Sequence, residues 1–106
     1  MNDCIFCQVI AGKLPGNFVY KDSDVVVIKD IHPSAPVHLL AISTQHITEI
    51  VDADETLVAK LFRVIKKVIQ EQKIVGYRLV TNGKGAALIN HLHVHILGGI
   101  EKMRKL

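Results

Sequence analysis

Three histidines alternate with three apolar residues between His91 and Ile96. Side chains of a β-strand point alternately to its two faces, so a strand here would carry His91, His93 and His95 on one face. The apolar residues between them would then face a core, whereas a helix would scatter the histidines around its circumference. The pattern predicts a half-buried strand with a histidine face. The alternative is an amphipathic strand whose outward histidines have no function.

The rest of the chain predicts an α+β fold, with a mostly antiparallel five-stranded sheet, one long helix and a short N-terminal helix. The short helix is expected over residues 4–12. Apolar residues at helical spacing predict the long helix, which begins near Asp52 or Asp54, with Asp52 and Glu55 as a capping box. Strands are expected over residues 18–21, 24–29 and 37–42 before this helix and over residues 77–81 and 92–97 after it.

Length and composition narrow the class of protein. The 106 residues predict a single domain over 1–106, and 49% hydrophobic residues suffice for a core. Much of the net charge of +3 lies in residues 101–106, which we expect to be a solvated end and not a patch for polymeric nucleic acid. The sequence contains neither an apolar run of membrane-spanning length nor a secretory signal, so we expect a cytoplasmic protein without a membrane partner.

Several residues have side chains suited to nucleotide chemistry. Histidine can act as base, acid or nucleophile near neutral pH. Asp30 lies in a predicted loop, where a carboxylate can bind ribose hydroxyls, although an aspartate in such a loop is more often a turn residue. The backbone amides of Gly83 and Gly85 can hold phosphate oxygens. In a reducing compartment, Cys4 and Cys7 are expected as thiols or metal ligands.

Three segments together resemble the histidine triad family, in its nucleotide-binding phosphoramidase branch. The run from His91 to Gly99 is similar to the family signature, in which histidines alternate with apolar residues. Residues 30–42, beginning Asp-Ile-His-Pro-Ser-Ala-Pro-Val-His, and residues 4–7, Cys-Ile-Phe-Cys, are similar to two further segments of that branch. The three segments occur in the expected order and span nearly the whole chain.

The resemblance implies a homodimer that hydrolyses purine nucleoside 5′-phosphoramidates or related nucleotides. It implies that His93 attacks the α-phosphorus and forms a nucleotidyl-histidine, and that His95 and His38 belong to the same catalytic cluster. Asp30, with Ile31 beside it, would bind the ribose, and Asn82 would help to hold the phosphate. This chemistry requires no metal cofactor.

The resemblance also implies a structural zinc site in many members. Its ligands here would be Cys4, Cys7, His46 and His91, a Cys2His2 set suited to tetrahedral zinc. The alternative is two buried cysteines with ordinary polar histidines.

Two apolar residues that precede Asp30 are candidates for contact with the nucleotide base. Val26 and Ile28 could sandwich the base, because the pocket of the family is apolar there, or they could pack in the core. The preference for a purine rests on the resemblance alone.

The turn before the triad departs from the family pattern. It is shorter than is usual, and Ala87 and Leu88 stand where the branch has Gln and Ser, so neither side chain can donate a hydrogen bond to the phosphate. Two alternatives therefore stay open beside the hydrolase: a nucleotide-binding regulatory dimer with little turnover, and a small zinc-stabilised interaction domain without a ligand.

Overall fold

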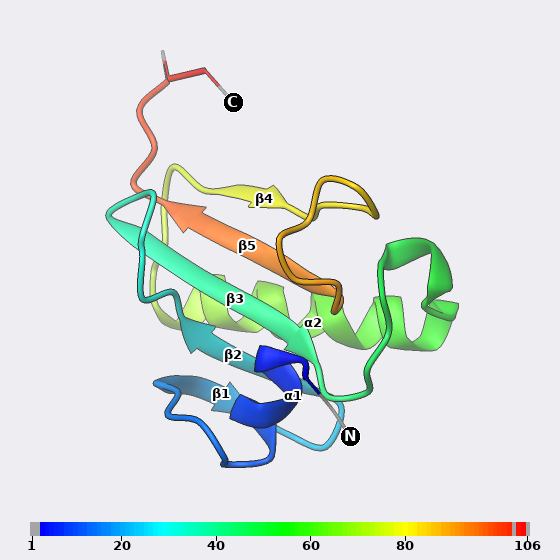
Figure 1. The fold of residues 1–106 in the computed structure, drawn as a ribbon. Helices are drawn as coiled ribbons and strands as arrows, with labels where there is room; N and C mark the ends of the chain where they lie inside the picture. Colours follow the sequence, from blue (N-terminus) through cyan, green and yellow to red (C-terminus); the bar gives the residue numbers. More distant parts are fainter. Residues whose placement is uncertain (1–2, 103, 106) are drawn as a thin grey trace.

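The computed structural model describes residues 3–102 and 104–105. The chain begins with α1 (Ile5–Ile10), β1 (Phe18–Lys21), β2 (Val25–Lys29) and β3 (Val37–Ser43). A 3₁₀ turn over Ile50–Asp52 leads into α2 (Glu55–Glu71), which is followed by β4 (Arg78–Val80) and β5 (His93–Gly98). These elements confirm the predicted α+β fold with five strands, one long helix and a short N-terminal helix (Figure 1).

The five strands form one antiparallel sheet in the order β1-β2-β3-β5-β4. The last strand of the sequence therefore lies inside the sheet, between β3 and β4 (Figure 1). Its register places Ile42 opposite His93 and Leu40 opposite His95. Directly opposed residues of antiparallel strands share a face, so His93 and His95 lie on the same face as Leu40 and Ile42. His38 lies on this face too, because it precedes Leu40 by two residues along β3.

The other face of the sheet is covered by α2. The helix turns an apolar stripe toward the sheet, as its spacing predicts, and each fully buried Leu, Ile or Val contributes about 1.5–3 kcal/mol to stability. The buried residues of α2 are Leu61, Val64, Ile65 and Val68, and they pack against Val25, Val27, Leu39, Ala41, Val94 and Ile96.

The start of α2 corrects one detail of the sequence prediction. The N-cap is Asp54, whose side chain accepts a hydrogen bond from the Leu57 N–H at 2.8 Å. Asp52 lies in the preceding 3₁₀ turn, and Ala53 between them has extended backbone angles, φ −85° and ψ 137°. The predicted capping box of Asp52 and Glu55 is therefore wrong, because the extended residue separates Asp52 from the first turn of α2.

The short helix α1 packs on the histidine face. Phe6 and Val9 are buried there against β2 and β3. The Cys4 sulfur accepts a hydrogen bond from the Cys7 N–H at 3.5 Å and caps this helix. Both cysteines are thereby placed on the same side of the sheet as the histidines.

Two glycines follow the triad for steric reasons. A Cβ atom at Gly98 would lie 2.6 Å from Ile74 Cγ2 and 3.0 Å from Val37 Cβ, so any side chain there would clash with its neighbours. Gly99 has φ +74°, in the left-handed region that favours glycine. The pair lets the end of β5 pass close to β3 and then turn away.

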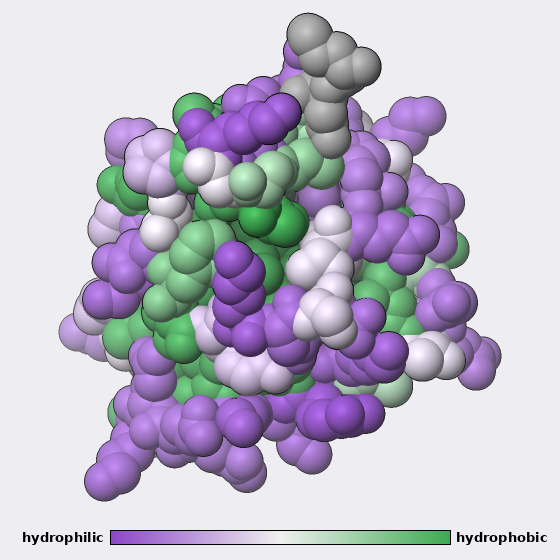
Figure 2. All heavy atoms as spheres, turned by 90° about the horizontal axis from the view of Figure 1, so that it is seen from below, coloured by the Kyte–Doolittle hydropathy of each residue, from purple (hydrophilic) through white to green (hydrophobic). Residues whose placement is uncertain are grey.

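The surface is polar over much of its area. Seen from below in Figure 1, on the side of β1, hydrophilic side chains cover most of the molecule and smaller apolar areas lie between them (Figure 2). Among the described residues, no helix has the length and apolar character needed to cross a membrane.

Candidate functional site: a histidine cluster beside a cysteine-histidine group

The pairing of β3 with β5 brings three histidines together. The His93 and His95 rings have centroids 5.1 Å apart, and the His38 ring lies 5.1 Å from that of His95. His38 and His93 are 8% and 7% exposed, so both are nearly buried, while His95 is partly exposed. Three imidazoles therefore lie together on one face of the sheet, two of them nearly buried and one partly exposed.

A backbone amide sets the tautomer of His38. The Ser34 N–H donates to His38 Nδ1 at 2.9 Å, so that nitrogen is an acceptor and the proton of a neutral ring lies on Nε2. His38 Nε2 lies 2.9 Å from His95 Nδ1 and donates to it. His95 then has its own proton on Nε2. The pair is thus directional, and His95 keeps an N–H for a substrate oxygen or leaving group.

A backbone carbonyl sets the opposite tautomer in His93. Its Nδ1 lies 2.6 Å from the His91 carbonyl oxygen, which can only accept, so Nδ1 carries the proton. The lone pair is therefore on Nε2, as a nucleophilic imidazole requires. The Phe6 ring packs edge-on against His93 at 5.0 Å between centroids and limits the rotation of the imidazole.

Asp30 lies beside this cluster, at the end of β2. Its Oδ1 accepts a hydrogen bond from the His32 N–H at 2.8 Å, and its Oδ2 is 3.3 Å from His38 Nε2. The next residue, Ile31, is 85% exposed and offers apolar surface next to the carboxylate. A carboxylate fixed in this way has free acceptor capacity for hydroxyl donors.

Burial changes the proton affinity of two of these histidines. Burial lowers the pKa of His38, while the Asp30 carboxylate acts in the opposite direction. Burial also lowers the pKa of His95, and the neighbouring His93 and His38 lower it further against the effect of Asp30. Both rings are therefore neutral near pH 7, in agreement with the hydrogen bond between them.

A second group of side chains meets at the start of α1. His91 Nδ1 lies 3.2 Å from the Cys4 sulfur and 3.4 Å from the Cys7 sulfur, and His46 Nδ1 lies 3.2 Å from the Cys7 sulfur. All four ligand atoms lie within 4.8 Å of one another. The structure thus brings together all four residues that the resemblance implies as a zinc site.

These four residues fit a tetrahedral metal ion. Zinc bond lengths of about 2.3 Å to sulfur and 2.0–2.1 Å to nitrogen place adjacent sulfur and nitrogen ligands about 3.5 Å apart. His91 Nε2 lies 2.7 Å from the Ser43 carbonyl and donates to it, which leaves the lone pair on Nδ1, toward the sulfurs. His91 is therefore in the tautomer that a metal ligand needs. The group could hold zinc as a structural ion.

Asp30, His38 and His95 form another group whose ligand atoms lie within 4.8 Å of one another. Here the tautomers oppose metal binding. His38 Nε2, the atom that faces the group, carries the proton because Nδ1 accepts from Ser34. The hydrogen-bond partner of the other ring nitrogen therefore distinguishes the cysteine-histidine group from the group with Asp30. At His91 a carbonyl partner leaves a lone pair on the nitrogen that faces the group. At His38 an amide partner places the proton on that nitrogen instead.

The other residues predicted to bind a nucleotide have different surroundings. Val26 has no exposed surface and Ile28 is 7% exposed, and both pack in the core with Phe6 and Val9. Of the two alternatives for these residues, core packing is what the structure contains, and Val26 offers no surface to a base. Asn82 follows Thr81, whose hydroxyl donates to the His93 carbonyl at 2.8 Å, so it lies near the start of β5. Gly85, with φ +95°, lies in an exposed turn.

Sequence reasoning missed several residues that shape the site. Phe6 contacts two histidines, the Ser34 amide and the Ser43 carbonyl set tautomers, and Thr81 binds the backbone of His93. Two of these act through the backbone, which carries no signal in side-chain type. The contacts of Phe6 join segments about 85 residues apart, so no local spacing could reveal them.

Comparisons with known proteins agree with this geometry. Residues 3–105 match the family model described as "Scavenger mRNA decapping enzyme C-term binding". The chain is 35% identical over 104 residues to protein HitA of Neisseria gonorrhoeae, covering 92% of this chain and 97% of that protein. It is similar to the solved HIT family hydrolase of Clostridium thermocellum, with 37% identity, a TM-score of 0.90, and coverage of 100% and 98%. A histidine triad protein of Clostridium difficile is similar at 31% identity and a TM-score of 0.89, with the same coverage.

The lowered pKa values predict an acid-sensitive fold. His38 and His95 have a lower pKa in the folded protein than the value of about 6.5 in the unfolded chain. At a pH between these two values, the unfolded chain binds more protons than the folded protein does. The free energy of unfolding therefore falls as the pH falls below about 6.5. We expect the urea midpoint of unfolding to decrease between pH 7 and pH 5, and to decrease less in His38→Gln. His32→Gln, which changes an exposed histidine of the same loop, should retain the full pH dependence. Equal pH dependence in the natural protein and His38→Gln would contradict the assignment.

Proposed function

The chain belongs to the histidine triad family, and from that premise we propose that it hydrolyses purine nucleoside 5′-phosphoramidates or related nucleotides at the α-phosphate. The observation that carries the proposal is the tautomer of His93. Its Nδ1–H is held by the His91 carbonyl at 2.6 Å, so Nε2 presents a lone pair beside the N–H donor of His95. A nucleophile and a hydrogen-bond donor thus lie on one strand.

The proposed reaction has two displacements at phosphorus. In the first, His93 Nε2 bonds to the α-phosphorus while the bond to the leaving nitrogen breaks, the leaving amine takes a proton from solvent water, and the Nε2–H of the neutral His95 donates a hydrogen bond to a phosphoryl oxygen. In the second, water attacks the nucleotidyl-histidine, the bond between Nε2 and phosphorus breaks, and the proton of the attacking water returns to solvent. Splitting the reaction in this way replaces one difficult step by two easier ones.

Other groups of the site would bind the nucleotide. We propose that Asp30 accepts hydrogen bonds from the ribose hydroxyls, with the exposed Ile31 as apolar surface beside it. Asn82 and the amide of Gly85 would hold phosphate oxygens. The base would meet Ile28 only at its small exposed area, because most of that side chain is in the core.

A second candidate function is a nucleotide-binding regulatory dimer with little turnover. The observation that favours it is the turn before β5, where Ala87 and Leu88 lack donor side chains and Leu88 is fully exposed. Binding of AMP without turnover would distinguish this function from the hydrolase.

We also propose that the chain forms a homodimer through β4. This strand has three residues and lies at the edge of the sheet, so within the described part of the chain no strand pairs with its outer side. Leu79 pairs with Ile96, on the face covered by α2, and is 37% exposed. Tyr77, just before β4, and Phe62, in α2, add apolar surface, and their side chains are 52% and 38% exposed. A two-fold axis would join two such edges, each complementary to its own copy.

The nucleophile is tested by His93→Ala. We expect the rate of AMP release from adenosine 5′-phosphoramidate to fall to background in this variant. The loss should be at least about 10³-fold, because removal of a catalytic nucleophile typically costs this much or more. His32→Ala, which changes the exposed histidine next to Asp30's turn, is the matched control for loss of an imidazole. If the natural protein binds AMP but releases no more product than His93→Ala, the regulatory dimer replaces the hydrolase.

The proposed structural zinc is tested by metal content and melting temperature. We expect the purified protein to hold one zinc per chain and Cys7→Ser to hold much less. Occupancy at 1,000 times the dissociation constant contributes about 4 kcal/mol to stability, so chelation should lower the melting temperature by several degrees. Ser23→Ala, which changes an exposed hydroxyl that is not one of the four proposed ligands, should keep the metal. Full zinc content in Cys7→Ser would refute this ligand set.

The dimer is tested by sedimentation. We expect Leu79→Asp to convert the dimer into a monomer, because it places a charge in the apolar contact. Val51→Asp is the matched control, since Val51 is 78% exposed in the 3₁₀ turn and belongs to neither β4 nor α2. Sedimentation of the natural protein as a monomer would contradict the dimer, and a dimer that survives Leu79→Asp would exclude the β4 edge.

A further inference from the structure

The loop of residues 30–36, which precedes β3 and contains Asp30, is hydrogen-bonded to the C-terminal tail. The guanidinium of Arg104 donates from Nη2 to the Ser34 carbonyl at 3.0 Å. The carbonyl of Arg104 accepts in turn from Nη2 of Arg78, on β4, at 2.5 Å. Arg104 thus connects an edge strand of the sheet to a loop 70 residues away in the sequence. The described residues of the tail are exposed, as its composition predicts, but Arg104 is held by hydrogen bonds at both its side chain and its carbonyl.

Ser34 is also the residue whose amide sets the tautomer of His38. Its N–H donates to His38 Nδ1 at 2.9 Å, and His38 Nε2 lies 2.9 Å from His95 Nδ1. The two backbone groups of Ser34 therefore point to different partners: the N–H to the catalytic pair and the carbonyl to the tail. A shift of Ser34 would break the hydrogen bond that makes His38 Nδ1 an acceptor, and only the Asp30 carboxylate, 3.3 Å from His38 Nε2, would then favour the proton on Nε2.

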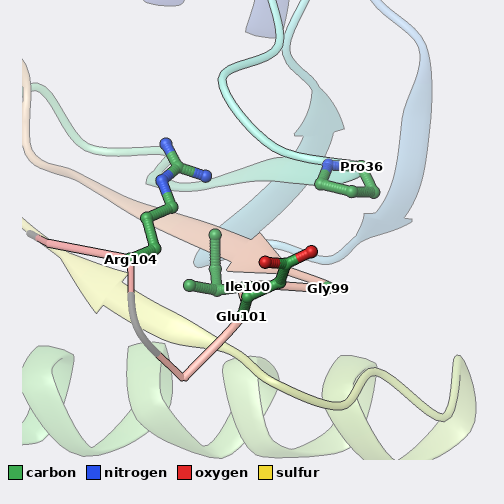
Figure 3. A pocket seen from close by; sticks show the side chains of 5 residues that line it. All are labelled: Pro36, Gly99, Ile100, Glu101 and Arg104. Atoms are coloured by element: carbon green, nitrogen blue, oxygen red, sulfur yellow. The ribbon is translucent and has the colours of Figure 1, made fainter.

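The loop has little apolar packing to hold Ser34 in place. Residues 31–34 and Pro36 are exposed. A cavity of about 450 Å³ lies between the loop and the tail, lined by Pro36, Gly99, Ile100, Glu101 and Arg104 (Figure 3). Figure 3 shows the Arg104 side chain extending from the tail toward the loop before β3. The hydrogen bond from Arg104 to the Ser34 carbonyl joins the two segments here, beside the close approach of Pro36 to Gly99.

We propose that Arg104 is a positioning residue for the reaction: it holds the Ser34 segment so that the Ser34 amide keeps His38, and through it His95, in the tautomer that presents an N–H to the substrate. The inference rests on the proposed hydrolase for its effect on rate, but its effect on tautomers is independent of any activity. Arg104 itself touches no reacting atom in this account. Without it, Asp30 alone would favour the proton of His38 on Nε2, so part of the His38 rings would carry the proton on Nδ1 and would no longer donate to His95.

The test compares Arg104→Ala with Arg104→Lys and with Lys105→Ala, the exposed neighbour in the tail. Long-range ¹⁵N–¹H spectra report directly which ring nitrogen of His38 and His95 carries the proton. We expect Arg104→Ala to give a mixture of tautomers at both rings and about a tenfold lower kcat on adenosine 5′-phosphoramidate with KM nearly unchanged, as for a slightly misplaced catalytic group. Arg104→Lys should restore part of both, and Lys105→Ala should match the natural protein.

A second variant acts on the amide itself. Ser34→Pro removes the N–H, and we expect the same tautomer mixture at His38 if the fold, checked by its melting temperature, is retained. Unchanged His38 and His95 tautomers in Arg104→Ala would overturn the proposal, as would a tautomer change in Arg104→Ala that Lys105→Ala reproduces. If no form of the protein hydrolyses the phosphoramidate, the proposed function fails, while the spectra still decide the role of Arg104.

Discussion

The pairing of β3 with β5 is the constraint on which the rest of the structure depends. One register, with Leu40 opposite His95 and Ile42 opposite His93, decides which side chains enter the core and which form the site. A shift by one residue would exchange the two faces. It would then turn the histidines toward α2 and leave Val94 and Ile96, now 1% and 0% exposed, without their apolar neighbours. Burial of apolar residues under α2 thus keeps the histidines on the opposite face of the sheet. The same strand register therefore determines both the core and the site.

Within that frame, the roles of His38, His91 and His93 are decided by the backbone group bound to one nitrogen of each ring. A carbonyl holds the proton of His93 on Nδ1 and that of His91 on Nε2, and in each ring the opposite nitrogen keeps its lone pair. An amide at His38 does the reverse and turns that ring into a donor. Three side chains of one type on two adjacent segments of the chain's fold therefore acquire different chemistry through their backbone partners.

The alternation of histidines and the apolar stripe of the long helix were enough to predict the strand, the helix and the faces that they bury. The predicted zinc ligands came from resemblance, and the fold brings all four together across 87 residues. The capping box at Asp52 failed because one extended residue, Ala53, decides where the helix begins, and propensity cannot place such a break. The contacts of Phe6, Ser34 and Arg104 could not be predicted, since each depends on how distant segments meet.

The altered turn before β5 places more weight on the histidine pair. Where the family branch has Gln and Ser, this chain has Ala87 and Leu88, so two side-chain donors to the phosphate are missing. A transferring phosphoryl group needs preorganised donors around its oxygens, and each lost donor costs about 3–4 kcal/mol in comparable sites. The N–H of His95 is then a larger share of what remains. Fixing its direction through His38 and Ser34, two bonds of 2.9 Å, would matter more here than in a protein whose turn supplies donors of its own. Because the turn before β5 lacks these side-chain donors, a fixed position of the loop before β3 becomes more important. The hydrogen bond from Arg104 to the Ser34 carbonyl helps to fix that loop.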